Sequence, residues 1–350
     1  MQWATGNIGL RALREVIRHP ALQLVGVVVY DPEKEGVDAG ALCGGEPVGV
    51  LATTDLTAAR VLGADCVLYM PRSLDVDDVV PLLESGTNVV TTRSELFDAG
   101  YRLGDERRAR VLAACARGMS SIYATGSSPG FITDALPLTL LSTQRRVDSI
   151  DIEEFANLSR RDSPNLLFEL MGFGRPVDSF EAARASYLLL EFGPALAALA
   201  DAAARPVDDW TCTGEVATAR EQTSILAGDL EAGSIAAQRT NIVGRSDGAD
   251  VIRFTPTWYC TTDIEPAWDL RPTGWRVRVR GDAPFDVELP FPIALDDLGD
   301  YTPAYTANRP VNAIPYVCAA PPGILSTLDL PPITPAGPHG PDATSVRPPV

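Results

Sequence analysis

The chain has 350 residues, 45% of them hydrophobic, which is long and apolar enough for two domains with separate cores. Its formal net charge is −17 at pH 7 and its pI is about 4.5. This balance argues against nucleic acid and anionic membranes as partners, because both bind clustered positive charge.

Side chains that commonly transfer protons are scarce. Lys34 is the only lysine, and His19 and His339 are the only histidines. The six cysteines include no C-x-x-C pair, so we expect no metal site. Free thiols and the lack of an N-terminal signal peptide indicate a cytoplasmic protein, and no apolar run approaches the roughly 20 residues that span a bilayer. Catalysis must therefore use carboxylates, tyrosines, backbone groups or a cofactor.

The first expected strand is unusually short. Only residues 1–3 precede a glycine-rich loop, whereas strands typically have about five or six residues. We therefore expect the native start of the protein to lie several residues upstream of Met1.

Residues 4–9 match the dinucleotide fingerprint G-x-G-x-x-G, with alanine in the first glycine position. A helix is expected to follow, so Gly6 would let backbone N–H groups approach a pyrophosphate and Gly9 would allow close packing of helix and strand. Asp31 ends the next apolar run, where it would accept hydrogen bonds from the adenosine ribose. A simple turn at Asp31 is the alternative. The predicted contacts here are Thr5, Gly6, Asn7, Ile8, Gly9 and Asp31.

Asp31 also bears on the choice of cofactor. Its negative charge would repel a 2′-phosphate, which favours NAD, whereas the nearby Lys34 is within reach of such a phosphate. We expect NAD or NADP, with NAD slightly favoured.

The first half of the chain alternates strand-like and helix-like segments, which is typical of a doubly wound parallel sheet of the Rossmann type. The expected helices are 10–19, 76–84 and 105–117, and the expected strands are 22–30, 48–51, 64–70, 88–92 and 120–125.

The pattern changes after about residue 146. Residues 147–156 alternate apolar and polar, as in a sheet with one solvated face. Two helices are expected, at 179–193 and 195–206, and Ser-Asp-Gly at 246–248 is a hairpin signal. These features predict an α+β domain with a mixed sheet for substrate binding and dimerisation. Its other expected strands are 210–220, 234–246, 250–262 and 274–282.

We therefore expect three parts. Residues 1–130, completed by about 305–330, form the dinucleotide-binding domain, and residues 131–304 form the substrate and dimerisation domain. Residues 331–350, which are rich in proline, are expected to be a disordered tail.

Residues at the carboxyl ends of the parallel strands are candidates for ligand contacts, because ligands bind outside that edge in doubly wound folds. The further cofactor contacts predicted in this way are Met70, Pro71, Thr92, Gly126 and Asn312, with Asn312 near an expected helix start. Phe131, Phe168 and Phe173, with Trp258 and Tyr259, are the aromatic candidates for a substrate pocket, although aromatic residues more often fill a core.

Several motifs together resemble one family. The set is similar to the 2,4-diaminopentanoate dehydrogenase and native amine dehydrogenase family, often grouped as dihydrodipicolinate reductase-like, over nearly the whole chain to about residue 332. The motifs are QWATGNIG, VYDPEKEGVDAG, YMPR, VVTTRSE, TGSSPGF, EEFANLS, MGFG and TANRPVNAIP.

The resemblance implies NAD(P)-dependent interconversion of an amine with ammonia and a ketone or aldehyde, by a homodimer. The family's catalytic glutamate corresponds to Glu95. Its carboxylate would hold ammonium, take its proton so that free ammonia attacks the carbonyl, and stabilise the iminium. The alternative is that Glu95 is an acid at the start of a helix.

Two other functions stay open. A true dihydrodipicolinate reductase is not expected, because residues 130–175 contain neither histidine nor lysine and so lack the family motif E-x-H-H-x-x-K. An imine or carbonyl reductase of the same group remains possible. The third hypothesis is a dinucleotide-binding regulator without catalytic activity, which the imperfect phosphate loop would suit.

Overall fold

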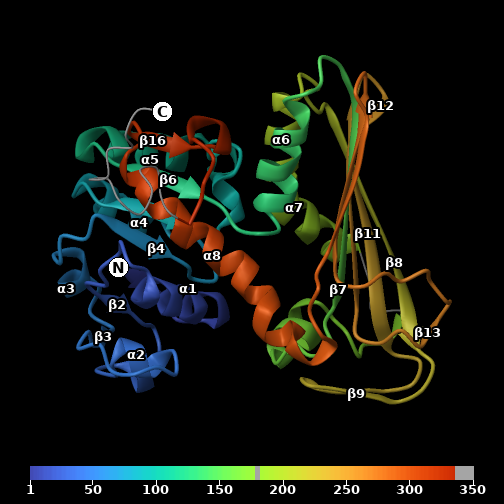
Figure 1. The fold of residues 1–350 in the computed structure, drawn as a ribbon, viewed down its shortest axis with the longest axis horizontal. Coiled ribbons are helices and arrows are strands. Elements are labelled where there is room, and N and C mark those ends of the chain that lie inside the picture. The colour runs from blue at the N-terminus through green and yellow to red at the C-terminus, as the bar shows by residue number, and fades with distance from the viewer. Residues whose placement is uncertain (178–181, 336–350) are drawn as a thin grey trace, which may run out of the picture. The chain divides into compact units, whose positions relative to one another are not determined.

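The computed structural model describes residues 1–177 and 182–335. The chain separates into two compact units (Figure 1). The first unit comprises Met1–Phe131 and the chain from Pro303 onward, and the second comprises Ile132–Thr302. The expected disordered tail at 331–350 lies outside the described residues from 336 onward.

The described residues of the first unit form a seven-stranded parallel sheet in the order β16-β6-β5-β4-β1-β2-β3. This confirms the predicted α/β class. The strands are β1 (Gln2–Trp3), β2 (Val27–Val28), β3 (Ala52–Thr53), β4 (Cys66–Tyr69), β5 (Asn88–Thr91), β6 (Ser121–Ala124) and β16 (Gly323–Leu325).

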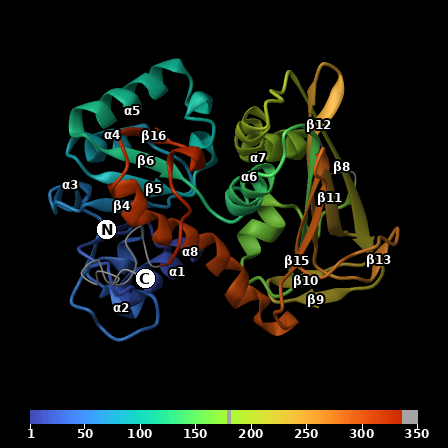
Figure 2. The same ribbon diagram turned by 45° about the horizontal axis from the view of Figure 1, so that its top comes forward.

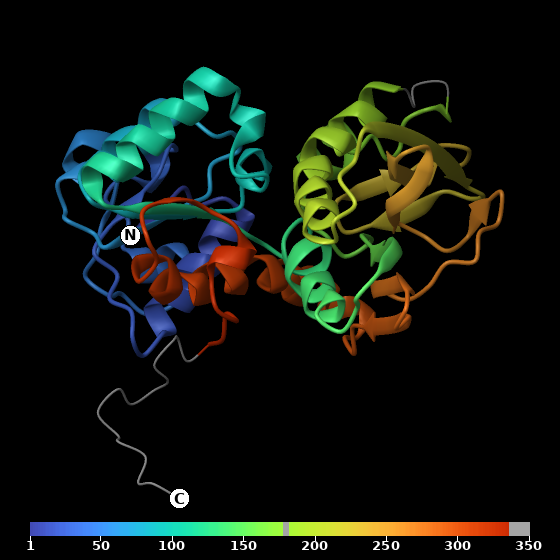
Figure 3. The ribbon, with the colours of Figure 1, turned by 90° about the horizontal axis from the view of Figure 1, so that it is seen from above.

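Helices cover both faces of this sheet. Ala12 and Val16 share a core with Leu68 of β4 and with Val311, so the first helix and the last one pack on one face. Figure 3 shows the fifth helix on the opposite face. The helices are α1 (Asn7–Arg18), α2 (Ala39–Leu42), α3 (Leu56–Arg60), α4 (Val76–Glu84), α5 (Asp105–Gly118) and α8 (Leu298–Cys318), which begins in the second unit.

Two strand predictions were wrong in extent. The expected strand at 22–30 contributes only the two residues of β2 to the sheet, and the strand expected at 48–51 is β3, at Ala52–Thr53. The neighbours of β2 in the sheet, β1 and β3, have two residues each, so a longer β2 would have no partner for its ladder. Leu22 and Leu24 instead pack against the core from outside the ladder.

The described residues of the second unit form a seven-stranded mixed sheet in the order β13-β8-β11-β12-β7-β14-β15, as predicted. Strands β12 and β7 are parallel and the other pairs are antiparallel. The predicted hairpin is confirmed, with Asp247 and Gly248 at φ 51° and 75°. The strands are β7 (Val147–Asn157), β8 (Asp209–Ala219), β11 (Ile235–Ser246), β12 (Ala249–Tyr259), β13 (Ile264–Glu265), β14 (Gly274–Gly281) and β15 (Phe285–Pro290), beside a small hairpin of β9 (Thr223–Ile225) and β10 (Gly228–Leu230).

The helical pair expected at 179–193 and 195–206 is one helix within the described residues, α7 (Ala182–Ala202). Pro194 lies inside it and does not end it. Phe192 of this helix packs on Phe254 of β12, with ring centroids 4.5 Å apart, so packing on the sheet offsets the hydrogen bond that proline removes. Figures 1 and 2 both show α6 (Leu136–Leu141) and α7 along the same face of the sheet.

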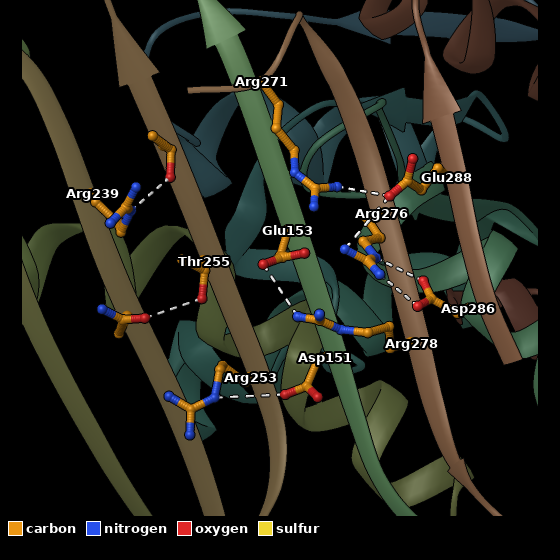
Figure 4. A network of polar contacts seen from close by, with 12 residues as sticks. Asp151, Glu153, Arg239, Arg253, Thr255, Arg271, Arg276, Arg278, Asp286 and Glu288 are labelled. Atoms are coloured by element: carbon orange, nitrogen blue, oxygen red, sulfur yellow. Dashed lines mark hydrogen bonds and ion pairs between the residues drawn. The ribbon is translucent and has the colours of Figure 1, made fainter. Parts of the chain in front are cut away.

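The two faces of this sheet differ sharply. The inner face, on which α7 packs, carries Ile152, Phe254 and Val277. The polar face, opposite to it, carries Asp151, Glu153 and several arginines (Figure 4). This is the alternation predicted for residues 147–156.

No helix among the described residues is long and apolar enough to cross a membrane.

Candidate functional site

The phosphate loop connects β1 to α1. Gly6 is the N-cap of α1 in an extended conformation, and a Cβ built on it would meet nothing within 4 Å. A Cβ on Gly9 would lie 2.2 Å from the Ala4 carbonyl oxygen. The close approach of helix and strand therefore requires glycine at position 9, whereas the space beside Gly6 is open for a ligand.

Ala4, in the first glycine position of the fingerprint, has φ +73°. This left-handed conformation is costly for a residue with a Cβ. The Gln2 side-chain amide donates to the Ala4 carbonyl oxygen at 2.8 Å and holds the peptide in place. The loop thus keeps the backbone shape of a glycine at the expense of strain.

We expect Ala4→Gly to raise the free energy of unfolding by about 0.5–1 kcal/mol, because the strain relieved at positive φ exceeds the added chain entropy. Urea denaturation measures the change. The matched control is Ala58→Gly in the exposed part of α3, which is expected to lower stability. A destabilised Ala4→Gly protein would contradict the assignment of strain.

A pocket of about 610 Å³ opens beside this loop, entirely within the first unit. It brings together five of the predicted cofactor contacts and several residues that the sequence did not single out. The predicted ones are Thr5, Gly6, Asp31, Met70 and Pro71, and the others include Tyr30, Tyr69, Arg72, Asp75 and Asp78. Asn7 and Ile8 form the first turn of α1.

Asp31 lines the pocket and also caps a local turn. Its Oδ1 accepts a hydrogen bond from the Glu33 N–H at 3.0 Å and caps a short 3-10 helix over Pro32–Lys34. That turn directs Lys34 to the phosphate loop, where its Nζ donates to the Thr5 carbonyl oxygen at 3.2 Å. The only ammonium side chain of the protein therefore contacts the loop itself.

A cluster of hydroxyl groups and acids forms another wall of the pocket. Trp3 Nε1 donates to the Tyr30 hydroxyl at 2.9 Å, and the Tyr69 hydroxyl donates to Asp78 Oδ2 at 3.3 Å. Burial raises the pKa of Asp78, and the nearby Asp75 raises it further. Arg60 forms an ion pair with Asp78 at 3.1 Å. The Tyr30 hydroxyl also donates to Asp78 Oδ2 at 3.4 Å, so the cluster joins positions up to 48 residues apart.

Glu95 follows β5 at the carboxyl edge of the parallel sheet. It lies in a short 3-10 helix, Ser94–Leu96, with its side chain 32% exposed. Arg93 contacts the Glu95 carboxylate at 3.3 Å. Thr92, half-buried, precedes this pair. A helical turn does begin at Ser94, as the alternative reading expected, and the Glu95 carboxylate still remains partly open to solvent.

The loop after β6 is packed against α8. Ser127 Oγ and Thr306 Oγ1 are 2.6 Å apart, and Arg309 Nε donates to Thr125 Oγ1 at 2.8 Å. A Cβ on Gly126 would lie 2.9 Å from the Pro129 carbonyl oxygen, so glycine is needed for the tight turn. Ser128 Oγ is buried without a hydrogen-bond partner among the described residues. This orphaned hydroxyl is the kind of group that a bound ligand satisfies.

The environment predicted for Asn312 was wrong. Asn312 lies well inside α8 and not near a helix start. Proline is common at the first position of a helix, but Pro303, Pro310 and Pro315 all lie inside this one, so a proline near Asn312 does not mark a helix start. Thr306 and Arg309, three residues apart and so on one helix face, are the residues of this motif that contact the loop after β6.

The aromatic candidates fall in both units. Phe131 lies beside Arg309 in the first unit, with the guanidinium carbon 5.9 Å from the ring centroid. Phe173 is 1% exposed in the core of the second unit, and Phe168 packs against that core. Tyr259 is also buried there. Their roles in a substrate pocket stay predictions.

The polar face of the second sheet carries a network of ion pairs (Figure 4). Asp151 and Glu153, both on β7, lie between arginines of the two neighbouring strands. Asp151 contacts Arg253 at 3.6 Å, and Glu153 contacts Arg278 at 3.2 Å. Within residues 1–177 and 182–335, no group of three or more His, Cys, Asp or Glu side chains is arranged to hold a metal ion.

Comparison with known proteins gives a consistent picture. The chain is 31% identical over 351 residues to an amine dehydrogenase of Streptomyces virginiae, covering 94% of this chain and 95% of that protein. It is 30% identical over 165 residues to a 4-hydroxy-tetrahydrodipicolinate reductase of Anaeromyxobacter sp., covering 46% of this chain and 58% of the relative.

Among solved structures, the amine dehydrogenase from Mycobacterium smegmatis superposes with a TM-score of 0.74 at 20% identity, covering 95% of this chain and 96% of that one. A probable dehydrogenase from Thermotoga maritima superposes with a TM-score of 0.56 at 11% identity, covering 94% of this chain and 92% of that one. No family model matches the chain.

Proposed function

The chain belongs to the amine dehydrogenase family of oxidoreductases, and from this membership we propose that it catalyses the reversible, NAD(P)-dependent reductive amination of a ketone or aldehyde with ammonia. The observation that carries the proposal is the position of Glu95. Its partly exposed carboxylate stands at the carboxyl edge of the parallel sheet, where the phosphate loop also follows β1.

The first unit suits a nicotinamide dinucleotide. The open space beside Gly6 and the pocket between Thr5, Asp31 and Met70 are where the backbone N–H groups and polar side chains would hold it. We assign Asn7, Ile8, Gly9, Pro71, Thr92, Gly126 and Asn312 to the same site, as predicted from the sequence. When bound, this cofactor accepts or delivers the hydride.

Glu95 performs the proton chemistry in this proposal. Its carboxylate binds ammonium, accepts one proton and releases neutral ammonia to attack the substrate carbonyl. Protonated Glu95 then donates its proton to the hydroxyl group of the carbinolamine, which leaves as water, and the regenerated carboxylate stabilises the positive charge of the iminium carbon–nitrogen group. Arg93, 3.3 Å from Glu95, holds the carboxylate in its orientation.

The decisive experiment mixes the protein with NADH or NADPH, ammonium and a panel of ketones and aldehydes, and follows loss of the reduced cofactor. Oxidation that depends on ammonium supports amination. Oxidation without ammonium would identify an imine or carbonyl reductase, and cofactor binding without any turnover would identify a regulator. Either of these two results overturns the proposal.

We expect a lower KM for NADH than for NADPH, because Asp31 borders the pocket and repels a 2′-phosphate. Asp31→Ser should reduce this preference by about tenfold, the effect of losing one charged hydrogen bond to the ribose. Steady-state kinetics with both cofactors measures it. Asp55→Ser, which removes the charge of an exposed helix cap outside the pocket, is the control and should leave the ratio unchanged. A wild-type preference for NADPH contradicts this assignment.

We also propose a homodimer formed through the polar face of the second sheet. The acids of β7 lie between Arg253 on β12 and the row of arginines on β14, so the same face of a second copy, displaced by one strand, would place the acids of one copy opposite the arginine row of the other (Figure 4). Sedimentation analysis is expected to give a dimer for the wild type and a monomer for Arg278→Glu. A monomeric wild type would overturn this proposal.

All six cysteines are free, which supports a reducing cytoplasm as the place of action.

A further inference from the structure

Three acidic residues lie close together on β7, and one of them differs from the other two in the face that it occupies and in its partners. Asp151 and Glu153 lie on the polar face, and each contacts at least one arginine (Figure 4). Glu154 points to the inner face and is 9% exposed. No lysine, arginine or histidine among residues 1–177 and 182–335 forms an ion pair with Glu154, although the chain has 28 arginines.

The partners of Glu154 are two neutral indole groups. Trp258 Nε1 donates to Glu154 Oε1 at 2.8 Å, and Trp275 Nε1 donates to Glu154 Oε2 at 2.9 Å. Each carboxylate oxygen therefore accepts one bond from the protein. A carboxylate has about four lone-pair sites, so about two remain for other donors.

This arrangement leaves a buried negative charge without a counter-charge, which is unfavourable unless a cation is supplied. A structural link between two indole N–H groups needs only acceptor atoms, which a neutral amide or a backbone carbonyl also provides. The charge of Glu154 is thus unexplained by the packing of this sheet.

The surroundings indicate what kind of cation fits. Trp258 lies 6.5 Å from Phe192, and Trp275 packs edge-on against Phe291 at 4.6 Å, measured between ring centroids. A hard metal ion is usually held by several carboxylates, and no group of three or more His, Cys, Asp or Glu side chains among the described residues is arranged to hold one. Aromatic rings around a carboxylate instead suit an alkylammonium group, with the rings contacting its carbon chain and the carboxylate accepting its N–H bonds.

We propose that Glu154, clamped between Trp258 and Trp275, binds an alkylammonium ion, the charged form of the amine that this enzyme forms or consumes, at a site separate from Glu95. The inference rests on the proposed function and adds a recognition site in the second unit. Trp258 and Phe291 are only partly buried, so the clamp lies close to the surface of that unit.

A binding measurement tests this inference independently of catalytic turnover. Calorimetry on the NADH-saturated Glu95→Gln protein compares isopropylammonium with propan-2-ol, which has nearly the same shape and no charge. This reference protein lacks the ammonium-binding carboxylate of the proposed mechanism, and NADH cannot oxidise the amine, so only recognition at the second site is measured. The reference protein should bind the ammonium at least about tenfold more tightly than the alcohol, as expected for one charge-assisted contact.

Glu154→Gln added to this reference protein should abolish the preference, because it keeps the shape and removes the charge. Glu153→Gln in the same background is the matched control, since Glu153 is the neighbour on the opposite face and pairs with Arg278. It should keep the preference of the reference protein. A reference protein without preference, or a Glu154→Gln protein that retains it, overturns the inference.

If Glu154→Gln does not fold, the indole N–H signals of the wild type provide the test. Those of Trp258 and Trp275, assigned with Trp→Phe variants, should move on addition of isopropylammonium and not of propan-2-ol. Unmoved signals overturn the inference. Ammonium-dependent oxidation of NADH without this recognition would overturn the inference alone, and recognition without such oxidation would overturn only the proposed function.

Discussion

Glu95→Gln is expected to lower the rate of ammonium-dependent amination by about 10²–10⁴-fold, which is the usual contribution of a general acid–base group. Glutamine keeps the size and polarity of the side chain but cannot take a proton from ammonium. NADH affinity should stay at the wild-type value, because the phosphate-binding loop and its pocket lie on other elements. Stopped-flow measurement of the hydride step and NADH fluorescence titration give the two quantities separately.

The control for this experiment is Glu106→Gln. Glu106 is an exposed acid in the first turn of α5, and its loss changes the net charge by the same amount. Its amination rate should equal that of the wild type. A Glu95→Gln enzyme with full amination turnover would remove the basis of the proposed mechanism.

Gly6→Ala is expected to raise the Kd for NADH by about 10- to 100-fold with little change in stability, since overfilling a packed contact costs about 1–3 kcal/mol. The added methyl meets no protein atom within 4 Å and Gly6 has φ −70°, so the free protein accepts it. The methyl would instead occupy the space that a pyrophosphate needs.

Gly9→Ala should differ from Gly6→Ala in its effect on stability. Its methyl would collide with the Ala4 carbonyl oxygen, so the melting temperature should fall together with cofactor affinity. Calorimetric melting and fluorescence titration of both variants distinguish a ligand contact from a packing contact. A Gly6→Ala protein that binds NADH as the wild type does would show that the dinucleotide does not approach this loop.

Elements whose signals are local were predicted well from the sequence. Helix α4 has the predicted bounds, and Asp75 caps it by accepting a hydrogen bond from Asp77. The hairpin between β11 and β12 follows from the conformational freedom of Asp247 and Gly248. In both cases a few neighbouring residues decide the structure.

The wrong predictions concern strands and helices whose extent depends on residues far away in the sequence. An apolar run such as 22–30 becomes a long strand only if its neighbours are long, and β1 and β3 are not. Two helices were predicted on either side of Pro194, which lies inside α7, and Asn312 was predicted near a helix start but lies inside α8. Packing of these helices compensates for the lost hydrogen bonds, and a single sequence does not reveal that packing.

The residues of the candidate site also differ in whether local sequence or the overall fold brings them together. The phosphate loop and Asp31 were found because their spacing along the chain is fixed by the turn that they form. Tyr30, Tyr69 and Asp78 come together only in the folded sheet, across up to 48 residues, and were missed. Glu154 was noticed only as part of a motif, because its lack of a cationic partner is visible only in three dimensions.

The contact between Lys34 and Thr5 has a practical consequence for attaching the enzyme to a support or a dye. Amine-directed coupling would find one lysine side chain, and it sits on the phosphate loop, so such coupling would block the cofactor. Cys318, the exposed thiol at the end of α8, is the better attachment point, because the other five cysteines are buried or partly buried. Conjugation chemistry for this protein should therefore use maleimides and avoid succinimidyl esters.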